Sequence, residues 1–249
     1  MPFLDKRKQT FFNVGFGVVL MIFVLLLAHG SLRESGGIVL PEMPADSSGT
    51  ADEGTSSGMN VIAVTPETVQ TAIDTLARPV SYQRQQTVET FWSGGSGKTV
   101  SQVSVSGDYT RVDSTLADST ATHMLVIAGT AALWYDDETE WVTLTSQEFT
   151  GDIAQRMLTY ETVLDLPVED ILEADYRERD GVYCIYVSTR EDENGYAEQY
   201  WVSVSSGLLL AAERSQGGKL IYRFTAGEPV SEAPSASLFL LPDGSTLIP

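Results

Sequence analysis

The chain contains very few of the side chains that metal sites and disulfides require. Among its 249 residues there is one cysteine, Cys184, and there are two histidines, His29 and His123. A single cysteine cannot form an internal disulfide, and Cys184 lies in the strand-like run VYCIYV, where we expect a small buried hydrophobic residue. Zinc sites need several histidine or cysteine ligands, so the sequence predicts no metal and no cofactor.

Complete enzyme motifs are also lacking. Residues 94–99, GGSGKT, resemble the end of a phosphate-binding loop, but Trp92 stands where that motif needs its first glycine. The alternating run VSQVSVSG follows, which favours a hairpin turn. A catalytic triad in the body would have to use His123, and no nucleophile-elbow motif accompanies it. The acidic runs at residues 136–140 and 191–193 lack calcium-loop spacing and are expected to be solvated turns. We therefore expect a protein that is not an enzyme.

Basic residues are scarce. The chain has 15 lysines and arginines against 34 acidic residues, a formal net charge of −19. Most of the acid lies in residues 61–249, and the basic cluster Lys6-Arg7-Lys8 lies near the N-terminus. Phosphate backbones would repel a body this acidic. We therefore do not expect nucleic acid as a partner.

One long apolar run is present, from Phe11 to Ala28, and Asn13 is its only polar residue. At about 1.5 Å per residue it spans a hydrocarbon core of roughly 30 Å. Because basic residues precede it, the positive-inside rule predicts residues 1–9 in the cytoplasm, a transmembrane anchor over 10–29 and an extracytoplasmic remainder of a single-pass membrane protein. The alternative is a cleaved signal peptide with a small-x-small site at residues 28–30. The run is longer than most cleavable signals, which favours the anchor.

Residues 30–60 are rich in glycine, serine, proline and acid, which is typical of a flexible linker. The folded body is expected over residues 61–249, which is long enough for one core. Short runs of alternating apolar and polar residues, separated by turn residues, fill most of it. Strands are predicted near residues 80–91, 99–106, 109–116, 122–128, 131–136, 140–145, 182–190 and 196–204, and over the remaining runs of residues 199–224.

Helices are predicted at three places. One extends from Thr65 to about residue 77, a second region follows a cap at Thr150 and contains Ile153, and a short helix opens at Pro167 and runs to about residue 173. This order predicts an α+β domain with one large antiparallel sheet that short helices cover. Tyr200 and Trp201 point to opposite faces, so the strand that carries them should be covered on both sides.

The run QYWVSVSSGLLLAAERSQGGKLIYRF over residues 199–224, followed by LFLLPDG over 238–244, resembles the C-terminal half of the LolA and RseB superfamily. The resemblance lies in a strand with a Tyr-Trp pair, a Gly-Leu turn and a closing F-x-x-P-x-G pattern, and it covers residues 61–249. It implies an incomplete β-barrel wrapped around helices, with an apolar cavity for an acyl chain or a hydrophobic peptide.

The candidates for the wall of that cavity are large side chains from the strands and the helical segment: Trp134, Trp141, Met157, Tyr200, Tyr222 and Phe224. The alternative is that all six pack in an ordinary sealed core, which is the commoner place for aromatic residues. Two functions follow from the resemblance. One is a membrane-anchored, LolA-like protein that holds a lipid, a lipoprotein acyl chain or another apolar ligand. The other is an RseB-like envelope sensor that acts on a membrane partner protein.

Overall fold

The computed structural model describes residues 63–145, 148, 153 and 158–248. The predicted anchor over 10–29 and the predicted linker over 30–60 lie outside the described residues. Within the described part of the chain, no helix has the length and apolar character needed to cross a membrane.

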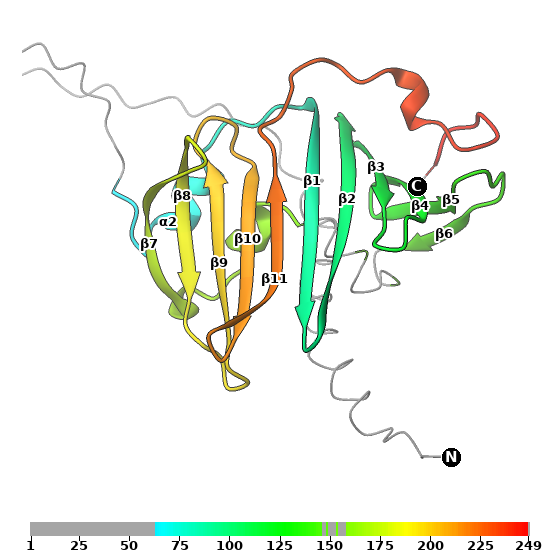
Figure 1. Cartoon of the computed structure of the whole chain (residues 1–249). Coiled ribbons are helices and arrows are strands. Elements are labelled where there is room, and N and C mark those ends of the chain that lie inside the picture. Colours follow the sequence, from blue (N-terminus) through cyan, green and yellow to red (C-terminus); the bar gives the residue numbers. More distant parts are fainter. Residues whose placement is uncertain (1–62, 146–147, 149–152, 154–157, 249) are drawn as a thin grey trace, which may run out of the picture.

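A single antiparallel sheet of eleven strands organises the described chain (Figure 1), in the order β6-β5-β4-β3-β2-β1-β11-β10-β9-β8-β7. The sheet therefore consists of two meanders, β1–β6 and β7–β11, and the first and last strands join them side by side in its middle. The strands are β1 (Ser81–Trp92), β2 (Gly95–Ser106), β3 (Tyr109–Thr115), β4 (Ala121–Ile127), β5 (Thr130–Tyr135), β6 (Val142–Thr145), β7 (Ile171–Arg179), β8 (Val182–Thr189), β9 (Tyr196–Ser203), β10 (Leu209–Gln216) and β11 (Lys219–Ala226). The predicted large antiparallel sheet is confirmed, and its two edge strands, β6 and β7, do not pair with each other to close a barrel.

The register of the strands defines an inner face, on which the helices α2 (Val69–Asp74) and α4 (Glu161–Leu164) pack. Val88 pairs with Phe224, and Arg84 on the same face of β1 pairs with Val103. Directly paired residues share a face, as do residues an even number apart in a strand. Phe224 and Val103 therefore face the same side, although they belong to different meanders.

Two apolar clusters lie on this inner face. The first cluster joins α2 and α4 to the second meander, and its fully buried members include Val69, Ile73, Val163, Ile185 and Phe224. The second cluster lies over β2–β5 and consists of Val103, Val112, Met124, Val126, Ala131 and Ile153. Apart from the helical residue Ile153, every member of the second cluster is a strand residue, and all of them are at most 6% exposed.

A third cluster lies on the opposite, outer face of the first meander. The C-terminal segment, with the 3-10 helix η3 (Ala236–Phe239), packs there on β4 and β5 (Figure 1). The cluster consists of Leu125, Ala132, Trp134, Phe239, Leu241 and Leu247. A segment from the end of the chain thus covers part of the face that points away from α2 and α4.

Guanidinium groups cover the aromatic residues on the outer face of the second meander. Arg177 stacks on Tyr186 at 3.7 Å, and Arg179 stacks on Trp201 at 3.9 Å. Glu213 accepts hydrogen bonds from Arg179 at 3.1 Å and from Arg223 at 3.2 Å. These arginine side chains stack on the aromatic rings and pair with a carboxylate. They therefore shield the rings from water, although no second layer of strands or helices packs there. Trp201 is thus covered on its face by residues of the same sheet.

The helical predictions need two corrections. Pro167 opens only the 3-10 turn η2 (Val168–Asp170), and the edge strand β7 begins at Ile171, where a helix was predicted to continue. The helix predicted from Thr65 is shorter than expected, because a turn over residues 66–68 precedes α2. The predicted cap Thr150 lies outside the described residues.

Candidate functional site

Three of the six predicted cavity residues lie together on the inner face. Tyr200 is 4% exposed, Tyr222 9% and Phe224 0%, and all three belong to the first cluster under α2 and α4. Alternation in β11 groups Tyr222 with Phe224, and the pairing of β9 and β11 through β10 brings Tyr200 to the same face. In the described chain their rings pack against protein, as the core alternative predicts.

The other three predicted residues do not join them. Trp134 pairs with His123 and Leu133 pairs with Met124, which places Trp134 on the outer face, in the third cluster. Trp141 packs against that same cluster. Met157 lies outside the described residues. Trp134 and Trp141 therefore help to hold the C-terminal segment and are separated by the sheet from Tyr200 and Phe224.

A partly buried polar network lies beside the aromatic residues of the first cluster. Arg214 donates from Nε to Glu198 Oε1 at 2.6 Å, and the Tyr200 hydroxyl donates to Oε2 of the same carboxylate. Burial, with the Glu198 charge next in size, raises the pKa of Tyr200 well above its usual value. Burial also raises the pKa of Tyr222. Both phenols therefore stay neutral and the carboxylate stays paired, which is a structural arrangement.

Buried polar residues separate the first cluster from the second on the inner face. Gln86 is 3% exposed, and Ser101, Ser114 and Thr122 are each at most 4% exposed. The hydroxyl groups of Ser101 and Ser114 lie 2.8 Å apart and hydrogen bond to each other. We call these four residues, together with Arg84, the polar seam. It places hydrogen-bonding groups next to an apolar surface, which is the composition typical of a binding site for an amphipathic ligand.

Side-chain hydrogen bonds fix the two helices over the first cluster. The Gln70 amide donates to the carbonyl oxygens of Val163, Leu164 and Leu166 at 2.7–3.1 Å, which ties α2 to the end of α4. At the other end of α2, Gly207 lies so close that a Cβ atom would be 2.8 Å from the Ala77 carbonyl oxygen. Only glycine allows this contact at a φ of +66°.

Asp165, at the end of α4, has a raised pKa. Burial, with the Glu161 charge as a second cause, raises the pKa of Asp165 from 3.8 to about 6. The folded state therefore favours protonated Asp165, and this contribution to stability is complete below pH 3.8 and is lost as the pH rises through about 6. Asp165→Asn should raise the melting temperature at pH 8 and leave it nearly unchanged at pH 4. Thermal unfolding at both values tests this, and an equal shift at both would contradict the role of the charge.

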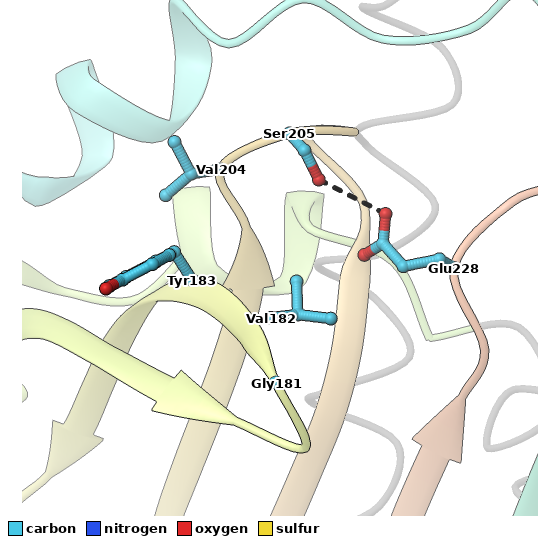
Figure 2. Close-up of a pocket in the computed structure, with 6 residues that line it drawn as sticks. All are labelled: Gly181, Val182, Tyr183, Val204, Ser205 and Glu228. Carbon is cyan, nitrogen blue, oxygen red and sulfur yellow. Dashed lines mark hydrogen bonds between the residues drawn. The ribbon is translucent and has the colours of Figure 1, made fainter.

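A surface pocket of about 440 Å³ lies where β8 begins and β9 ends (Figure 2). Tyr183, which is 69% exposed, and Val204, which is 37% exposed, form its apolar part. Ser205 donates to Glu228 across the rim at 3.2 Å. The five predicted site residues that the structure describes do not line it. Sequence patterns gave no sign of this pocket, because Glu228 and Tyr183 come from distant parts of the chain.

His123 lies on the outer face between two acids. Its Nδ1 is 2.6 Å from Asp113 Oδ1 and its Nε2 is 3.4 Å from Asp136 Oδ1. Arg111 also donates to Asp113 at 2.6 Å and to the Leu238 carbonyl at 3.4 Å. This group therefore helps to hold the C-terminal segment on the sheet.

The sequence matches no family model and no curated protein. Solved structures similar to the chain include a LolA superfamily protein from Nitrosomonas europaea, with 15% identity and a TM-score of 0.35 over 71% of this chain and 98% of that one. The MucA/MucB complex from Pseudomonas aeruginosa has 15% identity and a TM-score of 0.41, over 68% and 57%. Lipoprotein LppX from Mycobacterium tuberculosis has 12% identity and a TM-score of 0.38, over 68% and 94%. The resemblance predicted from the sequence agrees with these matches, which concern fold alone.

Proposed function

We propose that the chain is a membrane-anchored extracytoplasmic protein whose body holds an apolar ligand, such as an acyl chain, on its inner face. One observation carries the proposal. The inner face bears two buried apolar clusters, of which α2 and α4 pack on the first and Ile153 packs on the second. The members of the second cluster over β2–β5 are at most 6% exposed, so a ligand chain held there would insert between the strands and Ile153. The apolar surface of a chain that inserts there would leave water, which is worth about 25 cal/mol per Å² of that surface.

The polar seam supports the same ligand class. Binding sites for small molecules are mostly apolar, with a few placed polar groups that orient the ligand. Ser101 and Ser114 lie on β2 and β3, the strands that also carry Val103 and Val112 of the second cluster. An amphipathic molecule would meet both kinds of surface at once.

Photolabelling of the full chain in nanodiscs tests the proposal, with a diazirine-bearing fatty acid as probe and empty nanodiscs as blank. We expect the label in peptides from residues 95–135, and we expect excess dodecanoate to remove it. Labelling confined to other peptides would contradict a site on the second cluster.

Two adjacent alanines of β5 provide a matched pair of variants. Ala131 is 0% exposed in the second cluster on the inner face, and Ala132 is 0% exposed in the third cluster on the outer face. Replacing either with leucine overpacks a cluster, at a cost of about 1–3 kcal/mol. Only Ala131→Leu should reduce labelling, by several-fold. Equal labelling of both variants would exclude the inner face as the site.

A second candidate function is an envelope sensor that acts on a membrane partner protein. The exposed Tyr183 and Val204 at the pocket of Figure 2 favour it, since exposed apolar patches often mark protein contacts. A sensor of this kind does not require fatty-acid uptake. Absence of specific labelling in the wild-type chain would therefore overturn the first proposal and favour the second.

A further inference from the structure

Arg84 places a buried guanidinium group on the inner face. It lies in β1 between Tyr82 and Gln86, and it is 6% exposed. Its strand partner is Val103 of the second cluster, and its Nη1 donates to the carbonyl oxygen of Leu209, a member of the first cluster, at 2.8 Å. The group thus lies at the boundary between the two apolar clusters, within the polar seam.

The hydrogen-bonding capacity of this group is only partly used. Arg84 Nε has no hydrogen-bond partner, and no carboxylate of the described residues lies within 4.0 Å of the guanidinium. The ring of Tyr82 is 5.9 Å away, near the limit for a cation–π contact. In contrast, carboxylates pair with five other arginines of the body: Arg111, Arg177, Arg179, Arg214 and Arg223.

Glu228 is a carboxylate whose charge acts on Arg84, but its hydrogen bond is made elsewhere. The carboxylate accepts from Ser205 at the exposed rim of the pocket in Figure 2. Burial lowers the pKa of Arg84, yet an arginine remains protonated at neutral pH. The inner face therefore holds a positive charge that no described residue neutralises by direct contact.

A buried charge without a partner is costly, and an anion that reaches it recovers part of that cost. Guanidinium groups bind carboxylate and phosphate oxygens through pairs of parallel hydrogen bonds. We propose that Arg84 binds the anionic head group, a carboxylate or a phosphate, of an amphipathic ligand whose chain lies on the second cluster. This inference rests on the proposed function and adds a charge requirement to it.

Competition between single-chain ligands tests the inference. Dodecanoate, dodecyl phosphate and dodecanol share one apolar chain and differ in head group. Each competes with the diazirine fatty acid for labelling of the wild-type full chain in nanodiscs. We expect at least one of the two anions to compete ten-fold or more better than dodecanol, and the better anion identifies the head-group class.

Variants at Arg84 assign that preference to the residue. Arg84→Gln should abolish the advantage of the anion while dodecanol competes as before, and Arg84→Lys should retain part of it. Arg111→Gln is the matched control, since Arg111 lies on the outer face and pairs with Asp113 at 2.6 Å. That variant should keep the full preference. Persistence of the preference in a folded Arg84→Gln chain would overturn the inference.

If Arg84→Gln fails to fold, the order in which the three compounds compete for the wild-type chain still tests the charge requirement. Equal competition by all three compounds would overturn the role of Arg84 and leave the apolar ligand standing. Failure of all three to compete would instead overturn the proposed function itself.

Discussion

Phe224→Ala should lower the free energy of unfolding by about 3–5 kcal/mol. Phe224 is 0% exposed and packs in the first cluster with Val88, its partner across the central strand pair. Truncation removes apolar contacts and leaves a cavity that neighbours on two meanders and a helix cannot close. Urea unfolding of the full chain, followed by tryptophan fluorescence, measures the loss.

Tyr183→Ala is the control for that measurement. Tyr183 is 69% exposed, so its truncation should change stability by less than about 1 kcal/mol. If Phe224→Ala costs no more than this control and reduces fatty-acid labelling, Phe224 lines a ligand cavity and the first cluster is not a sealed core.

Glu198→Gln should destabilise the protein by about 2–3 kcal/mol. It removes the charge that Arg214 pairs with and weakens the hydrogen bond from Tyr200. Breaking a fully buried pair typically costs 3–5 kcal/mol. We expect less here because the side chain of Arg214 is 30% exposed and that of Glu198 is 19% exposed. The same urea unfolding experiment measures the change.

A double variant measures how much of the loss comes from leaving the Arg214 charge without its partner. Glu198→Gln combined with Arg214→Met removes both charges, and it should be more stable than Glu198→Gln alone. Additive losses in the double variant would show that the two side chains do not interact in solution.

Most of the sheet could be predicted because its strands alternate and glycine turns separate them. β7 was missed for a physical reason. It is an edge strand, and most of its outward side chains are charged, as in the run ILEADYRER. Such a strand shows little apolar alternation. The Asp180-Gly181 turn after it, with both residues at positive φ, was the available hairpin signal.

The site was predicted less well than the sheet. Alternation groups Tyr222 with Phe224, but it cannot relate one strand's faces to those of a distant strand. The sequence pattern therefore grouped Trp134 with Phe224, although the two side chains lie on opposite faces of the sheet. Only the strand pairing from β5 through β1 to β11 shows this. Arg84 shares a face of β1 with Tyr82, Gln86 and Val88, so its face could have been predicted from the sequence. Its lack of a counter-ion could be seen only in the three-dimensional structure.

The pairing of the first and last strands also has a kinetic consequence. Within each meander, every strand pairs with its neighbour in sequence, so each meander can form from its own segment of the chain. The ladder between residues 86–90 and 222–226 joins segments that the strands β2–β10 separate in sequence. Contacts so distant in sequence are slow to close. We therefore expect the rate-limiting step of folding to be the docking of two preformed halves, after which the inner face is complete.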